Sequence, residues 1–293
     1  MISYYFKNCL MRNTFILFCF IIYSFSFAQN KMPYQIFDKN GKVSSYNALI
    51  KTSAQAEIVL FGEYHDNSII HWLELEFAKD LQLKKKLIFG AEMLEADNQT
   101  QLNQYLKGEI DQKQLDSTAR LWPNYKTDYQ PLVDFAKEKN IPFIATNIPR
   151  KYASMVYKKG FESLEVLGET EKSFIAPLPI SYDSNLPGYK KMVEEMEGHG
   201  GENLPKAQAI KDATMAYFIV KNLQKNSLFI HYNGSYHSDK YEGIFRYIKK
   251  SNPKAKITTI ATVTQKNISK LETENKNKAD FIIVVDEDVT KTY

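Results

Sequence analysis

Two short segments, far apart in the chain, share one pattern of residues that could do chemistry. Residues 62–66 read GEYHD, and residues 234–239 read GSYHSD. Each segment follows an apolar run, and together they hold two of the 5 histidines in the chain. Because a neutral imidazole can ligate a metal ion or act as a base near neutral pH, the repeated pattern predicts that His65 and His237 serve one site. The alternative is that each histidine caps a helix or fills the core.

Two carboxylates stand where apolar runs end. Glu63 lies inside the first segment, and Glu92 directly follows the run LIFGA. A carboxylate at such a position can ligate a hard metal, orient a histidine or act as a general base. Glu63 could instead cap the next helix. Glu92 has apolar neighbours, and a buried carboxylate needs a partner, so we predict that both belong to the site.

Two further residues are secondary candidates. Asp212 shares a helix face with Gln208, four residues earlier, and could orient a histidine or a bound group. The alternative for this pair is a structural hydrogen bond. His199 lies in a glycine-rich turn that could close over a ligand, although a surface position is the simpler interpretation. We predict structural roles for His71 and His231.

The elements that would position these residues alternate along the chain. Short apolar runs rich in β-branched residues predict strands at 56–62, 86–93, 141–147, 226–234, 256–263 and 280–285. Apolar residues at helical spacing predict helices between them, including 67–85, 131–139 and 206–225. This alternation predicts an α/β fold with a mostly parallel central sheet flanked by helices. Ligands bind at the carboxyl ends of strands in such sheets, so both Gly-x-Tyr-His segments should lie on one edge.

Residues from about 165 to 205 interrupt this alternation with four prolines and a glycine-rich turn. We predict a smaller helical and irregular insertion there, within a single domain at 29–293. Residues 1–28 have a basic head, an apolar stretch and a small residue at the end, which predicts a cleaved signal peptide. An uncleaved anchor is the alternative. The protein would then be periplasmic or secreted.

Cleavage after Ala28 would restrict the chemistry. Both cysteines, Cys9 and Cys19, precede the cut, so the exported protein would form no disulfide and no thiolate site. Loss of Lys7 and Arg12 lowers the formal net charge of +4 by two, to +2. That charge is too weak for nucleic-acid binding, and the sequence has no basic stripe interleaved with aromatic residues. It also lacks the G-x-S-x-G, phosphate-loop and H-E-x-x-H motifs.

Taken together, these segments resemble the ChaN-like haem-binding family, which belongs with the Tiki and erythromycin-esterase-like proteins. The matching stretches occur in the family's order at 60–67, 90–95, 128–150, 198–201, 207–216 and 234–239. The resemblance implies an exported protein that binds haem, serves iron acquisition and meets an outer-membrane haem or iron uptake machinery. A homodimer is left open. The resemblance places Glu63, His65, Glu92 and His237 at the core of the site. Family members are often lipoproteins, whereas this chain lacks a lipobox cysteine.

The resemblance leaves a second function open, a metal-dependent or metal-free hydrolase. In the metal-dependent form, His65, His237 and Glu92 would hold one divalent ion with an open position for water. Whether the protein is an enzyme stays undecided, with haem binding preferred.

Haem also suits the tyrosines near the site, because tyrosinate is an axial ligand of ferric haem. Tyr64 and Tyr236 each precede a site histidine, and Tyr129 belongs to an aromatic segment that could wall a flat macrocycle. The ligating tyrosine cannot be chosen from the sequence, and each phenol could simply pack. Arg150 follows another strand end and is a further candidate.

Overall fold

A central sheet organises the chain. The computed structural model describes residues 32–195 and 201–293. Within these ranges the sheet has seven strands in the order β1-β7-β6-β2-β5-β3-β4. Only the pair β1–β7 is antiparallel among its strand pairs. The strands are β1 (Tyr34–Asp38), β2 (Ile58–Glu63), β3 (Lys86–Glu95), β4 (Phe143–Asn147), β5 (Ser227–Gly234), β6 (Ile257–Gln265) and β7 (Phe281–Asp286). The predicted α/β fold with a mostly parallel sheet is confirmed.

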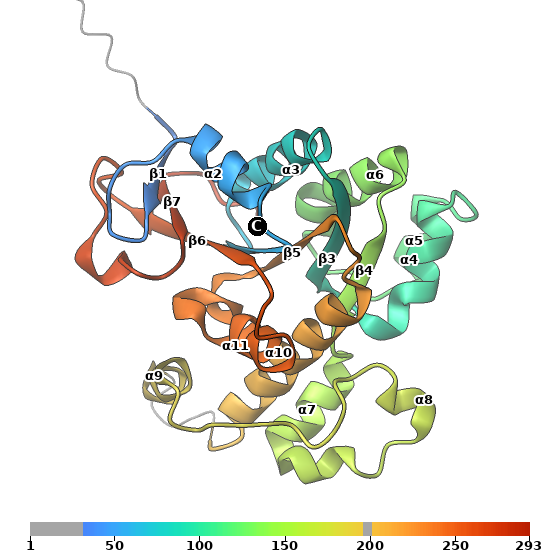
Figure 1. Ribbon diagram of the computed structural model, residues 1–293. Helices are drawn as coiled ribbons and strands as arrows, with labels where there is room; N and C mark the ends of the chain where they lie inside the picture. The colour runs from blue at the N-terminus through green and yellow to red at the C-terminus, as the bar shows by residue number, and fades with distance from the viewer. Residues whose placement is uncertain (1–31, 196–200) are drawn as a thin grey trace, which may run out of the picture. The chain divides into compact units, whose positions relative to one another are not determined.

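Helices cover both faces of this sheet (Figure 1). One face carries α2 (Tyr46–Ser53), α3 (Ser68–Gln82) and α6 (Gln130–Lys139), while α4 (Gln99–Leu106) and α5 (Gln112–Thr118) lie beside the edge strand β4. The other face carries α10 (Leu204–Asn222) and α11 (Gly243–Ser251).

The strands explain why two helical layers are needed. In β2, Val59 and Phe61 join the core beneath α3, whereas Ile58 and Leu60 join the core beneath α10 and α11. Successive strand residues point to opposite faces, so an uninterrupted apolar run can be buried only when both faces are covered.

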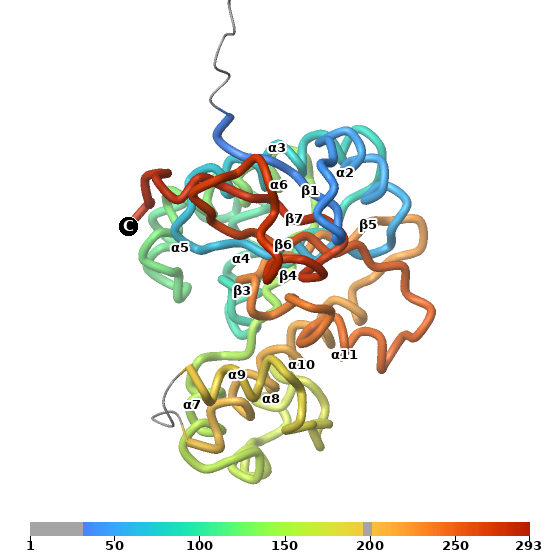
Figure 2. Tube along the Cα trace, turned by 90° about the vertical axis from the view of Figure 1, so that its left-hand side faces the viewer, coloured from blue at the N-terminus to red at the C-terminus, as the bar shows by residue number. Residues whose placement is uncertain are grey.

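A third group of helices extends beyond α10. Figure 2 shows α7 (Arg150–Lys159), α8 (Glu169–Lys172) and α9 (Pro187–Glu195) gathered on the far side of α10 from the sheet. Buried Tyr152 and Val156 on α7 pack with Ile210 on α10 and hold this layer together. The segment predicted as an insertion thus contains short helices joined by irregular backbone. The insertion boundaries at about 165 and 205 remain a prediction.

Some elements were not predicted. The lead-in to the domain forms β1, where Ile36 and Phe37 are buried against β7. Helices α2 and α5 and a π-helical turn at Tyr125–Tyr129 were also missed. The predicted helix at 67–85 is present as α3, and its N-terminus is capped by the Asn67 side chain, which accepts a hydrogen bond of 3.1 Å from the Ile70 amide.

Two predictions concern residues outside the described ranges. The predicted signal peptide at 1–28 lies before residue 32, and His199 lies in the undescribed stretch 196–200. Among helices of the described ranges, none is both long enough and apolar enough to cross a bilayer.

Candidate functional site

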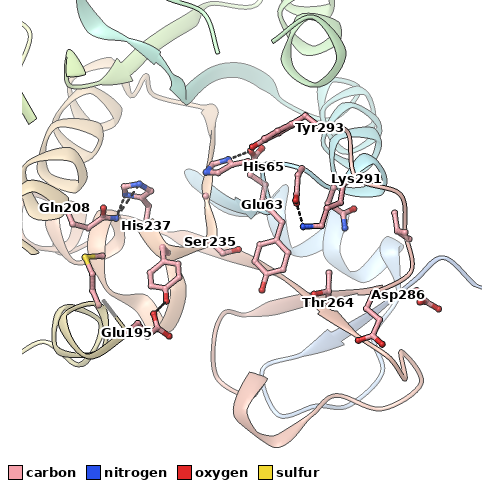
Figure 3. Close-up of a pocket in the computed structure, with 18 of the residues that line it drawn as sticks. Glu63, His65, Glu195, Gln208, Ser235, His237, Thr264, Asp286, Lys291 and Tyr293 are labelled. Carbon is pink, nitrogen blue, oxygen red and sulfur yellow. Dashed lines mark hydrogen bonds and ion pairs between the residues drawn. The ribbon is translucent and has the colours of Figure 1, made fainter. Parts of the chain in front are cut away.

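The two Gly-x-Tyr-His segments lie side by side because β2 and β5 are neighbouring parallel strands. Gly62 is paired with Asn233 and Glu63 with Gly234, so both strands end at the same edge. His65 and His237 line one cavity of about 770 Å³ at this edge. Figure 3 shows His237 on one side of the cavity, the C-terminal residues on the other, and His65 between them.

Glu63 orients His65. The His65 Nδ1 atom lies 2.7 Å from Glu63 Oε1, and the same oxygen accepts a hydrogen bond of 2.7 Å from the Tyr129 hydroxyl. The Trp122 ring packs edge-on against the His65 ring, with centroids 4.8 Å apart. Burial disfavours the charged imidazole, but the carboxylates of Glu63 and Glu92 outweigh burial and raise the pKa of His65. Nε2 forms no hydrogen bond with the described part of the chain, and His65 lines the cavity.

Gly234 lets the two histidine segments approach each other. A Cβ atom at this position would lie 2.7 Å from His65 Nε2 and 3.4 Å from Glu92 Oε2. The Gly234 amide donates a hydrogen bond of 2.7 Å to that same carboxylate oxygen. The absence of a side chain at Gly234 therefore determines how closely His65 can approach Glu92.

His237 is held between two buried carboxylates. Its Nε2 atom lies 3.1 Å from Glu92 Oε1, and its Nδ1 atom lies 2.5 Å from Asp212 Oδ1. Burial opposes a charge on the ring, but the two carboxylates raise the pKa of His237 to about 9. Both ring nitrogens therefore donate at neutral pH. The Gln208 side-chain nitrogen lies 2.9 Å from Nδ1 and 3.4 Å from Nε2, so this amide packs against the ring.

Glu92 is the anionic centre between the histidines. Burial alone would raise its pKa, but the charges of His237 and His65 and the Gly234 amide hold the pKa well below its usual range. The ion pair between Glu92 and His237 is almost fully buried, with 7% and 6% of the side chains exposed. A buried pair of this kind fixes geometry, since loss of either partner leaves an uncompensated charge.

A second polar cluster lies on the buried side of Glu63. Its other oxygen, Oε2, faces His71 Nδ1 at 3.8 Å, and His71 Nδ1 lies 3.2 Å from Glu74 Oε2. On the opposite side of the ring, His71 Nε2 donates a hydrogen bond of 3.0 Å to the His65 carbonyl. In the described ranges, one group of three His, Cys, Asp or Glu residues has potential metal-ligand atoms that all lie within 4.8 Å of one another. It consists of Glu63, His71 and Glu74.

Most of the residues predicted from the sequence lie in or beside the cavity. Those that line it are Glu63, Tyr64, His65, Tyr236 and His237. Those that contact a lining residue from behind are Glu92, Asp212 and Tyr129.

Other predicted residues are not brought together here. Arg150 begins α7 and lines a neighbouring cavity with Trp122. His199 lies outside the described residues. The predicted metal donors His65, His237 and Glu92 do not form a group with all donor atoms within 4.8 Å in the described ranges. That metal set stays a prediction.

Several residues at the site were not predicted from the sequence. His71 was assigned a structural role and Glu74 none, although their spacing of three residues on α3 places them on one face. The C-terminal residues Val289, Lys291 and Tyr293 also line the cavity. The Thr292 amide donates a hydrogen bond of 3.0 Å to the Asp66 carbonyl and holds this segment beside the first histidine turn. No local sequence pattern signals that contact.

Comparison with known proteins gives one family match and several similar proteins. The family model described as haem-binding uptake, Tiki superfamily, ChaN matches residues 49–248. A solved structure described as cofacial heme binding to ChaN of Campylobacter jejuni has a TM-score of 0.66 at 19% identity. The similarity covers 87% of this chain and 98% of that one. A succinoglycan biosynthesis protein has a TM-score of 0.51 at 12% identity, covering 82% and 90%. At these identities, both structural likenesses show a shared fold.

A curated plant protein is also similar in part. Protein RETICULATA-RELATED 5, chloroplastic, of Arabidopsis thaliana is 29% identical over 133 residues. The match covers 42% of this chain and 17% of that protein, so it concerns a small part of the plant protein.

Proposed function

Because this chain belongs to the ChaN family of haem-binding uptake proteins in the Tiki superfamily, we propose that it binds haem in the cavity shared by His65 and His237. The observation that carries the proposal is the pairing of β2 with β5, which brings two histidines and two tyrosines to one cavity. Its volume of about 770 Å³ lies within the range of roughly 300–1,000 Å³ typical of ligand pockets. Apolar side chains complete the lining, namely Met192, Leu204 and Val289.

Tyr64 and Tyr236 are the best axial ligands to ferric haem. Both line the cavity, and Tyr236 is 54% exposed, so iron can reach its phenol. Burial and the hydrogen bond to Glu195 raise the pKa of Tyr236 to about 12, and a ferric ion would displace that proton. Tyr129 is less suitable, since its buried hydroxyl already donates to Glu63. We assign Tyr129 a positioning role toward His65.

The mouth of the cavity offers a cation for the acidic edge of haem. The Lys291 ammonium pairs with Asp66 at 2.6 Å, and 72% of its side chain is exposed. An exposed pair of this kind is weak and can exchange partners at little cost. A haem propionate could therefore take the place of Asp66.

Titration with ferric haem tests the proposal. The mature protein should give a saturable Soret shift, and the His65→Ala/His237→Ala double variant should lose it. Tyr64→Phe or Tyr236→Phe should change the Soret position, whereas Tyr157→Phe on α7 is a matched control at an exposed tyrosine outside the cavity. No saturable shift in the original protein, or an unchanged shift in the double variant, would refute this site.

We further propose that the protein is exported and serves haem or iron uptake, with an outer-membrane uptake machinery as partner. The sequence of residues 1–28 supports export. N-terminal sequencing of the exported protein should begin at or near Gln29. Retention of Met1 would restore the anchor alternative and return Cys9 and Cys19 to the mature chain.

A homodimer would suit haem bound as in the similar Campylobacter jejuni protein, which is described as binding heme cofacially. Two haems facing each other need two binding surfaces, which two copies of this chain would supply. Sedimentation of the protein with and without one equivalent of ferric haem should show a doubling of mass on haem addition. A monomer at saturation would exclude a haem-linked dimer.

Hydrolysis is the second candidate function, favoured by one observation. Each cavity histidine is backed by a carboxylate, His65 by Glu63 and His237 by Asp212, as in general acid–base catalysis. Haem-free protein assayed on chromogenic esters should then show turnover that His65→Ala abolishes. Absence of turnover with and without added Zn²⁺ or Mn²⁺ would remove this candidate for that substrate class.

A further inference from the structure

Glu63, His71 and Glu74 form a buried polar cluster that haem binding does not explain. Its members come from the end of β2 and from the first two turns of α3. Glu63 is 1% exposed, His71 is 8% exposed and Glu74 is 2% exposed. Removing two carboxylates from water costs several kcal/mol unless something positive compensates them. Core packing alone does not account for these three residues.

We propose that Glu63, His71 and Glu74 bind one divalent transition-metal ion on the buried side of the haem cavity. This site shares Glu63 with the haem cavity, since Glu63 Oε1 holds His65 and Oε2 faces the cluster, but metal binding here does not require haem. The three residues supply one imidazole nitrogen and two carboxylates, all with donor atoms within 4.8 Å of one another. Two carboxylates, one neutral imidazole and a divalent ion sum to zero charge.

The distances between donors suit a single ion. Metal bonds to nitrogen and oxygen are about 2.0–2.2 Å long, so neighbouring donors around a tetrahedral ion lie roughly 3.4 Å apart. His71 Nδ1 lies 3.2 Å from Glu74 Oε2 and 3.8 Å from Glu63 Oε2.

Unpartnered oxygens point independently to a ligand. Glu63 Oε2 and Glu74 Oε1 are buried and accept no hydrogen bond from any residue in 32–195 or 201–293. Buried oxygens without a donor are costly and uncommon, and each calls for an explanation. The other Glu63 oxygen is fully engaged by His65 and Tyr129, which leaves Oε2 as the oxygen available to an ion.

His71 is oriented as a metal ligand would be. Its Nε2 atom donates a hydrogen bond of 3.0 Å to the His65 carbonyl, which also accepts from Asn124 Nδ2 at 3.0 Å. Asp128 Oδ2 lies 3.6 Å from the same Nε2 atom. Histidines that bind metals usually donate their other ring N–H to a carbonyl or carboxylate. With Nε2 protonated, the Nδ1 lone pair faces the cluster.

The donor set indicates the class of ion. Imidazole with carboxylates suits Zn²⁺, Mn²⁺ or Fe²⁺, whereas Cu⁺ prefers the sulfur ligands that this site lacks. The competing explanation is a metal-free cluster in which His71 is protonated, its pKa raised to about 10 by Glu74 and Glu63 despite burial, and Glu63 and Glu74 share a further proton. Measuring the metal content of the protein distinguishes a bound ion from a metal-free cluster.

The test is elemental analysis of tag-free, haem-free protein, made in medium supplemented with Zn²⁺ or Mn²⁺ and dialysed against EDTA. We expect close to one ion per chain, because a closed site releases its ion slowly. Glu74→Gln should lower occupancy at least tenfold. Glu76→Gln is the matched control, since Glu76 lies on the same helix, has 37% of its side chain exposed and pairs with Lys79 at 2.8 Å. Glu92→Gln should keep the ion, which distinguishes this site from one built on His65, His237 and Glu92.

A second measurement tests the site even if the Glu74→Gln variant does not fold. The original protein refolded with one equivalent of Co²⁺ should show visible absorption from a nitrogen and oxygen site, and His71→Asn should remove it. Folded original protein with less than one-tenth of an ion per chain after both treatments would overturn the proposal, as would equal occupancy in Glu74→Gln and Glu76→Gln. Ferric haem titration of the same samples shows separately whether haem binding fails.

Discussion

Adding one methyl group at Gly234 should disturb the cavity more than its size suggests. The backbone of Gly234 has φ −55° and ψ 141°, which any residue can adopt, so Gly234→Ala introduces no backbone strain. The new Cβ would lie 2.7 Å from His65 Nε2 and 2.9 Å from Cε1, whereas ordinary contact begins at 3.4 Å. The His65 ring must therefore retreat by about 0.7 Å, or the strand end must shift, as in other overpacked sites.

The expected cost follows from this overlap. Overpacking of a well-filled site costs about 1–3 kcal/mol, and each kcal/mol lowers the melting temperature of a domain of this size by about 2–4 °C. Movement of His65 away from Glu92 should also weaken haem binding about tenfold, which corresponds to about 1.4 kcal/mol. Thermal melts and Soret titrations measure the two effects.

Two controls make the result specific. Gly168→Ala adds a methyl group at φ −71°, where the nearest contact lies 3.8 Å away, and should leave both measurements unchanged. His65→Ala removes the ring that Gly234→Ala would strike, so the methyl group should cost much less in the double variant. Strictly additive effects on stability, or a Gly234→Ala protein indistinguishable from Gly168→Ala, would refute the packing described here.

Three further predictions concern charges at the site. In haem-free protein refolded without added metal, the free energy of unfolding should fall as pH rises from about 6.5 toward 9, as denaturant titration can measure. In the folded state the pKa of His237 is raised to about 9 and that of His71 to about 10. The stabilisation from His237, of the order of 3 kcal/mol, is complete below its unfolded pKa of about 6.5 and is lost as pH rises through about 9, with His71 adding a loss of the same sign at slightly higher pH. Glu92→Gln should cost about 2 kcal/mol at pH 6.5 and flatten this pH dependence, and an unchanged slope would argue against the Glu92–His237 pair. Lys291→Ala should leave the melting temperature unchanged but speed haem dissociation at least threefold in stopped-flow measurements; equal rates would exclude Lys291 as a propionate partner.

The central sheet was predictable because its strands are short, apolar and bounded by glycine or polar residues. β2 and β5 are buried on both faces; β2 begins with the apolar run IVLF, whereas β5, SLFIHYNG, also buries Ser227, His231 and Asn233. β1 was missed because its five residues, YQIFD, include polar positions and gain their burial only by pairing with β7. Such a strand depends on a partner almost 250 residues later, which no local pattern reveals.

The site was predictable to the extent that its residues follow strand ends. The matched segments around His65 and His237 indicated a common edge, and the structure places both histidines at one cavity. His71 and Glu74 were not singled out, because their role depends on which face of α3 turns toward Glu63. Lys291 and Tyr293 line the cavity only because the C-terminal segment folds back beside it. That path could not be predicted from the local sequence.

The strand order also constrains how the protein can fold during synthesis. β2 and β3 are consecutive in the chain, yet β5 lies between them in the sheet. Until residues 227–234 have emerged, β2 and β3 lack the strand that joins them, and their apolar edges stay open to wrong partners. Contacts between segments so distant in sequence form slowly. We therefore expect nascent chains that end before β5 to depend on chaperones, and the two histidine turns to meet only near the end of translation.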